Sequence, residues 1–156
     1  MRLIVLLCLS LIGHASSPSS AAEPSEVKIV KTLRHLLDKQ GRHTISPSLL
    51  DRDAYQAFLR DHPENVTGLR FDVQWRREKR DMGNLKLRVE IRHGSGSTIE
   101  NVTQTVAIET PSRRRSQWQQ IAITGDAYRA LHEVIAWRVS IWQEGAELAS
   151  QESFLW

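Results

Sequence analysis

The stretch Leu69-Arg70-Phe71-Asp72-Val73-Gln74-Trp75-Arg76 alternates apolar and polar side chains without interruption. Successive side chains of an extended chain point to opposite faces, so this period of two predicts a strand with one buried face. Leu85-Lys86-Leu87-Arg88-Val89-Glu90-Ile91-Arg92 repeats the pattern after a loop that contains Met82-Gly83-Asn84. A second strand is therefore expected to follow the first.

Further strands are expected towards the carboxyl terminus, at residues 98–110, 117–124 and 134–142, with a last one through Leu148. Residues 134–142 carry apolar side chains on both faces, which is typical of a strand inside a sheet. Five or six strands at hairpin spacing without helical crossovers predict a mainly β domain, built as an antiparallel sandwich.

A short helical segment is expected before these strands. Residues 27–37 fit neither a clean strand nor a clean helix, and Asp38-Lys39-Gln40-Gly41 predicts a turn. Ser46 can cap a helix that His62-Pro63 ends, because proline disfavours helical geometry in the residue before it. The apolar face of this helix is predicted to consist of Leu50, Ala54, Ala57 and Phe58.

One segment near the end of the chain resembles a known family. Ile121-Ala122-Ile123-Thr124-Gly125-Asp126-Ala127-Tyr128, followed by the strand that bears Trp137, resembles the corner of fibronectin type III and related immunoglobulin-like domains. Those families place a tyrosine just before a long inner strand. The resemblance covers the last two-thirds of the chain and implies an immunoglobulin-like sandwich, but no particular activity.

The first residues have the layout of a secretory signal peptide. Arg2 precedes an apolar run of about ten residues, roughly half of what a membrane-spanning helix needs, and small residues then lead to Ala22. We expect cleavage after Ala22 and no membrane span in the mature chain. The expected division is a signal peptide at 1–22, a flexible leader at 23–26, an N-terminal segment with the helix at 27–67, and the β-sandwich at 68–156, with the last two forming one compact unit.

Composition supports an exported protein, either periplasmic or secreted. Cys8, the only cysteine, lies inside the expected signal peptide, so the mature chain has neither a disulfide nor a thiol nucleophile. Such a chain fits a bacterial periplasm better than an animal extracellular space, where the sequons at Asn65 and Asn101 would be glycosylation acceptors. Without Arg2 the chain has 20 Lys and Arg against 18 Asp and Glu, a net charge of +2 that is too weak to imply nucleic acid.

Motifs of several enzyme classes are missing. The sequence has no phosphate-binding glycine loop, no paired cysteines and no His-Glu-x-x-His helix. His35 and His43 flank the expected turn at 38–41 and would converge across a hairpin, but the ligand pattern of a metal site is missing. We therefore assign no catalytic residue, no metal site and no cofactor from the sequence.

Two features are candidates for ligand or partner binding. Arg113, Arg114 and Arg115 form a basic run between apolar-patterned segments and could contact polyanions. Trp142 has the opposite parity to Trp137, so it lies on the outer face of its strand while most tryptophans fill the core. Either the helix covers Trp142 through Leu50 and Phe58, which we favour, or Trp142 is exposed and stacks on a sugar or a partner.

The favoured hypothesis is an exported, non-catalytic binding or assembly module whose partner is an envelope or extracellular protein or a glycan. An enzyme with a polar site assembled in space is the first alternative, and a weak polyanion-binding protein that uses the arginine loop is the second. A concave pocket that gathers a histidine with carboxylates would favour the enzyme.

The mature protein is predicted to begin near Glu23, because the small residues that a signal peptidase recognises end at Ala22. Intact-mass measurement of the exported protein checks this. A mass that still includes Met1 would contradict it.

Overall fold

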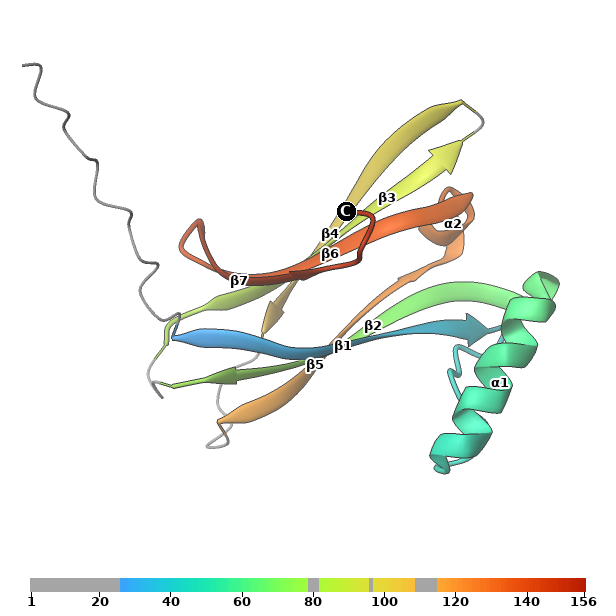
Figure 1. The fold of residues 1–156 in the computed structure, drawn as a ribbon, viewed down its shortest axis with the longest axis horizontal. Coiled ribbons are helices and arrows are strands. Elements are labelled where there is room, and N and C mark those ends of the chain that lie inside the picture. Colours follow the sequence, from blue (N-terminus) through green and yellow to red (C-terminus); the bar gives the residue numbers. More distant parts are fainter. Residues whose placement is uncertain (1–25, 79–81, 96, 109–114) are drawn as a thin grey trace, which may run out of the picture.

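The computed structural model describes residues 26–78, 82–95, 97–108 and 115–156; the expected signal peptide, Arg113 and Arg114 lie outside these ranges. Two antiparallel sheets face each other in the described chain (Figure 1). Sheet A has the order β1-β2-β5. Its strands are β1 (Val27–Asp38), β2 (Val66–Arg77) and β5 (Ser116–Thr124).

Sheet B has four strands in the order β4-β3-β6-β7. They are β3 (Leu85–Ser95), β4 (Thr98–Ile108), β6 (Glu133–Gln143) and β7 (Ala146–Glu152). β6 pairs with β3 on one side and β7 on the other, which confirms the inner strand predicted at 134–142. The described chain is thus a mainly β, antiparallel sandwich, as predicted.

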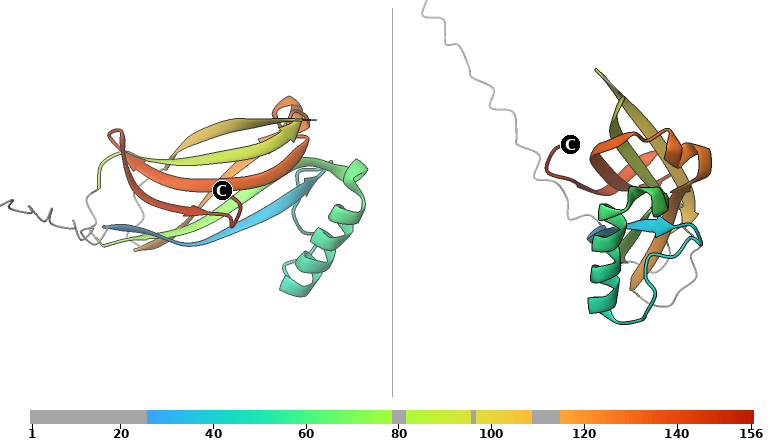
Figure 2. Two further views of the ribbon diagram at one scale, coloured as in Figure 1. Left: turned by 45° about the horizontal axis from the view of Figure 1, so that its top comes forward. Right: turned by 90° about the vertical axis from the view of Figure 1, so that its right-hand side faces the viewer.

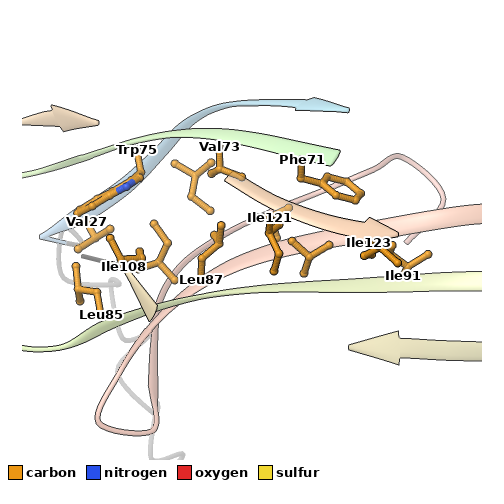
Figure 3. Close-up of a cluster of buried hydrophobic side chains, with 14 of the residues drawn as sticks. Val27, Phe71, Val73, Trp75, Leu85, Leu87, Ile91, Ile108, Ile121 and Ile123 are labelled. Carbon is orange, nitrogen blue, oxygen red and sulfur yellow. The ribbon is translucent and has the colours of Figure 1, made fainter. Parts of the chain in front are cut away.

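The core lies between the two sheets and is built mainly from the alternating residues of β2 and β3 (Figure 3). Phe71, Val73 and Trp75 of β2 point towards Leu87 and Ile91 of β3, and all five side chains are fully buried. Burial of a large apolar side chain stabilises a fold by roughly 1.5–3 kcal/mol. The period-two pattern therefore identified the inner faces of both strands.

The segment whose pattern fitted neither a helix nor a strand is β1. It pairs with β2 along its whole length, but the register shifts between Ile29 and Lys31. Such a bulge reverses the alternation of side chains partway along the strand, which explains why the sequence pattern is irregular. The N-terminal segment thus supplies one edge strand of sheet A, paired with β2.

Helix α1 spans Leu49–Asp61, and its N-cap lies two residues after Ser46, the cap predicted from the sequence. The N-cap is Ser48, whose hydroxyl accepts a hydrogen bond from the Asp51 amide. Ser46 instead accepts a hydrogen bond from the Ser48 amide, so it shapes the approach to the helix. The 3-10 helix η1 (Pro63–Asn65) follows α1, and α2 (Gly125–Arg129) connects β5 to β6.

The predicted buried face of α1 is wrong. Leu50 and Phe58 are 79% and 43% exposed, whereas Gln56 and Leu59 are buried. The Gln56 amide accepts a hydrogen bond from the Leu36 amide at 2.8 Å and donates to the Leu36 and His43 carbonyls at 2.9 and 2.8 Å. Helix α1 is thus fixed to the end of β1 by a buried polar side chain, and it lies at one end of the sandwich (Figure 2).

The turn predicted at 38–41 is present and is organised by Asp38. Its carboxylate accepts hydrogen bonds from the Gln40 and Arg42 amides, the Arg42 guanidinium and the Tyr55 hydroxyl. Burial alone raises the pKa of Asp38, but the hydrogen bonds from Arg42, Tyr55 and Gln40 outweigh burial and lower the pKa to about 2. The carboxylate therefore fixes the turn that follows β1.

Replacing Gly68 with alanine is predicted to destabilise the fold by about 1–3 kcal/mol. A Cβ atom there would lie 2.8 Å from the Thr124 side chain and 3.0 Å from the Ile123 carbonyl oxygen. Gly94→Ala is the control, because its Cβ would lie at an ordinary 3.5 Å from Ile135. Urea unfolding measures both variants, and equal midpoints would contradict the prediction.

Candidate functional site

The arginine run is described only in part. Arg113 and Arg114 lie outside the described residues, and Arg115 is exposed just before β5. Its carbonyl accepts a hydrogen bond from the Arg77 amide at 3.0 Å. The described part of the run therefore contributes a backbone contact to sheet A.

Trp142 lies on the outer face of sheet B, as its parity predicted. Its indole N–H donates a hydrogen bond to the Ser140 hydroxyl at 2.7 Å, and the Arg88 guanidinium lies 4.3 Å from the ring centroid. Helix α1 packs against β1 and η1 at the far side of sheet A, so the predicted cover of Trp142 by Leu50 and Phe58 is wrong (Figure 1). The half-buried ring instead lines a pocket with Arg88.

A second cluster, not assigned from the sequence, lies on the outer face of sheet A. A pocket of about 280 Å³, here called the histidine pocket, is formed where α1 and the loop after β1 approach the sheet. The pocket is lined by Leu33, His35, His43, Arg52, Arg70, Asp72, Trp118 and Gln120. The pairings of Leu33 and Gln120 with Asp72 place these strand residues side by side across the three strands.

Asp72 lies at the floor of the histidine pocket and is buried. One carboxylate oxygen accepts a hydrogen bond from the Arg70 guanidinium at 2.8 Å and lies 3.4 Å from His35 Nε2. The other carboxylate oxygen and Arg70 Nε are buried without a hydrogen-bond partner among the described residues. The floor of the pocket therefore contains two buried polar atoms without a hydrogen-bond partner. Such atoms lower the stability of the fold, so their presence indicates a functional role.

The two histidines converge as expected across the turn, with ring centroids 5.0 Å apart. Burial lowers the pKa of His35; Asp72 opposes this effect, while His43, Arg52 and Arg70 add to it. Burial also lowers the pKa of His43, and Arg70 and Arg52 outweigh the opposing effect of Asp72. Both imidazoles are therefore neutral at neutral pH.

Two side chains define the rim. Arg52, which α1 places over the pocket, also pairs with Asp53 at 2.7 Å, and the Asp53 carboxylate is largely exposed. Trp118 is 49% exposed, contrary to the expectation that most tryptophans are buried, because β5 pairs it with outward-facing Gln74. The rim thus presents one cation and one aromatic ring to solvent.

The architecture defines the class of protein as an antiparallel β-sandwich. None of the family models, curated proteins or solved structures compared with the chain matches it. No helix in the described ranges is long and apolar enough to cross a membrane. Within the same ranges, no three His, Cys, Asp or Glu side chains are grouped so that they could hold a metal ion.

Two charge substitutions around the histidine pocket are predicted to have opposite effects on the pKa values of His35 and His43. Arg52→Gln removes a positive charge and raises the pKa of His35 and His43, whereas Asp72→Asn removes a negative charge and lowers both. NMR titration of the imidazole C–H signals measures these shifts. Arg60→Gln on the same helix is the control, and an equal response to it would contradict the geometry.

Proposed function

We propose that this chain is an exported, non-catalytic binding module, and that the histidine pocket receives an acidic group of its ligand. The observation that carries the proposal is the lining of the pocket, where Arg52, Arg70 and two histidines surround a single carboxylate. Export rests on the signal-like first residues, and the partner class is an envelope or extracellular protein or a glycan.

The charges of the lining favour an anion. Arg70 is paired with Asp72, so with neutral histidines the remaining charge in the lining is that of Arg52. The Arg52 pair with Asp53 is exposed on the Asp53 side, and such surface pairs contribute little and exchange readily. An incoming anion can therefore compete for Arg52 while His35 and His43 take up protons.

Trp118 supports a ligand with a flat or apolar portion beside its acidic group. Its ring is half exposed at the rim of the pocket, next to Gln120 on the same strand. Aromatic rings combine apolar contact area with a fixed orientation, and for that reason they are frequent in binding surfaces. The pocket thus combines an aromatic ring with charged donors.

The immunoglobulin-like character of the sandwich is part of the proposal. Strand order β1-β2-β5 against β4-β3-β6-β7 supports it, and Tyr128 packs against the core just before β6. Because such sandwiches host many unrelated functions, the binding proposal rests on the pocket and not on the fold.

An enzyme is the second candidate, favoured by one observation. The concave histidine pocket brings His35 to 3.4 Å from Asp72, an arrangement that orients a general base in many enzymes. However, the described lining has no Ser, Thr, Cys or Lys nucleophile, and the His35 side chain is only 7% exposed. These facts favour binding over turnover.

Sulfate is the probe that tests the proposal, since its charge stays constant near neutral pH. We expect sulfate to shift the imidazole NMR signals of His35 and His43, with an affinity that rises as pH falls from about 7 to 5, because both free-state pKa values are lowered from 6.5. The sign follows because a bound anion raises both histidine pKa values, so protonation and binding favour each other.

Arg52→Gln is expected to weaken sulfate binding at least about fivefold, through loss of a charge-assisted contact, while Arg60→Gln leaves it unchanged. A sulfate affinity that is unchanged in Arg52→Gln, or that does not depend on pH, would refute the anion site. Turnover of ester or phosphoester substrates that is lost in His43→Gln would establish the enzyme instead.

A further inference from the structure

The outer face of sheet B carries two arginine–tryptophan pairs, whose arginines both lie on β3. Arg88 lies 4.3 Å from the Trp142 ring centroid, and Arg92 lies 4.7 Å from that of Trp156. Between them, Arg138 forms ion pairs with Glu90, Glu147 and Glu152. The first pair lines a pocket, here called the Trp142 pocket, which has a volume of about 350 Å³.

Side chains from both neighbours of β3 converge at the Trp142 pocket. Thr105 of β4 pairs with Arg88, and Trp142 of β6 pairs with Lys86. Asn84 precedes β3, and Glu144 lies in the turn between β6 and β7. The pocket therefore has an aromatic ring, hydrogen-bond donors and a carboxylate acceptor around one small space.

Arg88 differs from Arg92 in the burial of its side chain. Neither arginine forms an ion pair within the described residues, but the Nε atom of Arg88 is buried there without a hydrogen-bond partner. Stacking on Trp142, whose own N–H is fixed by Ser140, restrains the guanidinium with its remaining donors unpaired. A restrained guanidinium loses little entropy when it binds a carboxylate through two hydrogen bonds.

The backbone of Glu144 supplies an independent indication of a site. Glu144 has a φ of 48° and Gly145 a φ of 88°, so both central residues of the β6–β7 turn are left-handed. Such turns strongly favour asparagine, aspartate or glycine at the first position. A glutamate there costs stability, and residues held in this way cluster at ligand sites.

The charge balance of the pocket selects a monoanion. Lys86 and Arg88 against Glu144 leave one net positive charge in the lining. Asn84, Thr105 and Glu144 offer both donors and acceptors, as a ligand rich in hydroxyl groups requires. The volume is at the lower end of small-molecule sites, which suits one or two sugar rings.

We propose that the Trp142 pocket binds a sugar that carries a carboxylate, such as a uronic acid unit of a glycan. The carboxylate pairs with Arg88 and Lys86, the hydroxyl groups bond to Asn84, Thr105 and Glu144, and the Trp142 edge packs on the ring. This site lies on the opposite outer face from the histidine pocket, so it does not depend on the function proposed there.

Calorimetric titration with tetragalacturonate tests this proposal on the mature chain. The matched ligand is the same tetrasaccharide with its carboxylates methyl-esterified, and tetraglutamate supplies the charge without the sugar. We expect tetragalacturonate to bind at least about tenfold more tightly than either, because each lacks one half of the contacts. The indole N–H signal of Trp142 should shift on binding, while that of Trp156 should not.

Two variants and one control locate the site. Arg88→Gln is expected to weaken binding at least about tenfold. Glu144→Gly removes a carboxylate that bonds to the sugar hydroxyl groups, so it should weaken binding. It also relieves the backbone strain, so the unfolding midpoint should be equal or higher. Arg92→Gln, in the matched pair with Trp156, should retain the affinity of the unchanged protein.

Four results would overturn the proposal. They are no binding of tetragalacturonate at millimolar concentration, equal affinity for either comparison ligand, full affinity in Glu144→Gly, and equal losses in Arg88→Gln and Arg92→Gln. Because Glu144→Gly does not endanger the fold, the test stands even if Arg88→Gln fails to fold.

Discussion

Burial of the two inner sheet faces against each other is the constraint on which the rest of the structure depends. Phe71, Val73 and Trp75 meet Leu87 and Ile91 there, and strict alternation then sends every intervening side chain outward. Outward positions on neighbouring strands lie side by side, so polar residues at these positions can form a cluster on each outer face. His35 and Asp72 belong to one such cluster, and Arg88 and Trp142 belong to the other.

Helix α1 turns one of these clusters into a pocket, and it does so through Gln56. The Gln56 amide holds Leu36 of the strand and His43 of the loop at the same time, which fixes the distance between helix and sheet. A glutamine that satisfies three backbone groups can be buried at little cost, whereas an apolar residue there would leave those groups unpaired. Arg52, one turn earlier on the same helix, is thereby placed over the histidine pocket.

The sandwich could be predicted because its determinants are local: the period of two, the turn at 38–41 and the proline that ends α1 are all visible along the chain. The buried face of α1 could not, because Gln56 is buried for its backbone contacts and hydropathy therefore points to Leu50 and Phe58 instead. The histidine pocket was missed for a related reason. Arg70 and Asp72 have the pattern of solvated outer residues, and only the register of β1, β2 and β5 brings them beside His35 and Trp118.

The hydrogen bonds between the Gln56 side chain and Leu36 also affect how the edge of sheet A can pair with another chain. β1 is an edge strand, and an unprotected edge is a template on which another chain can add a strand. Gln56 occupies both backbone groups of Leu36, and farther along the strand Thr32 is engaged by Gln151 of β7. At Leu36 the backbone groups that an incoming strand would need are thus already used, whereas the Thr32 contact joins two side chains. The helix that shapes the pocket therefore also blocks the addition of a strand at this end of the β1 edge.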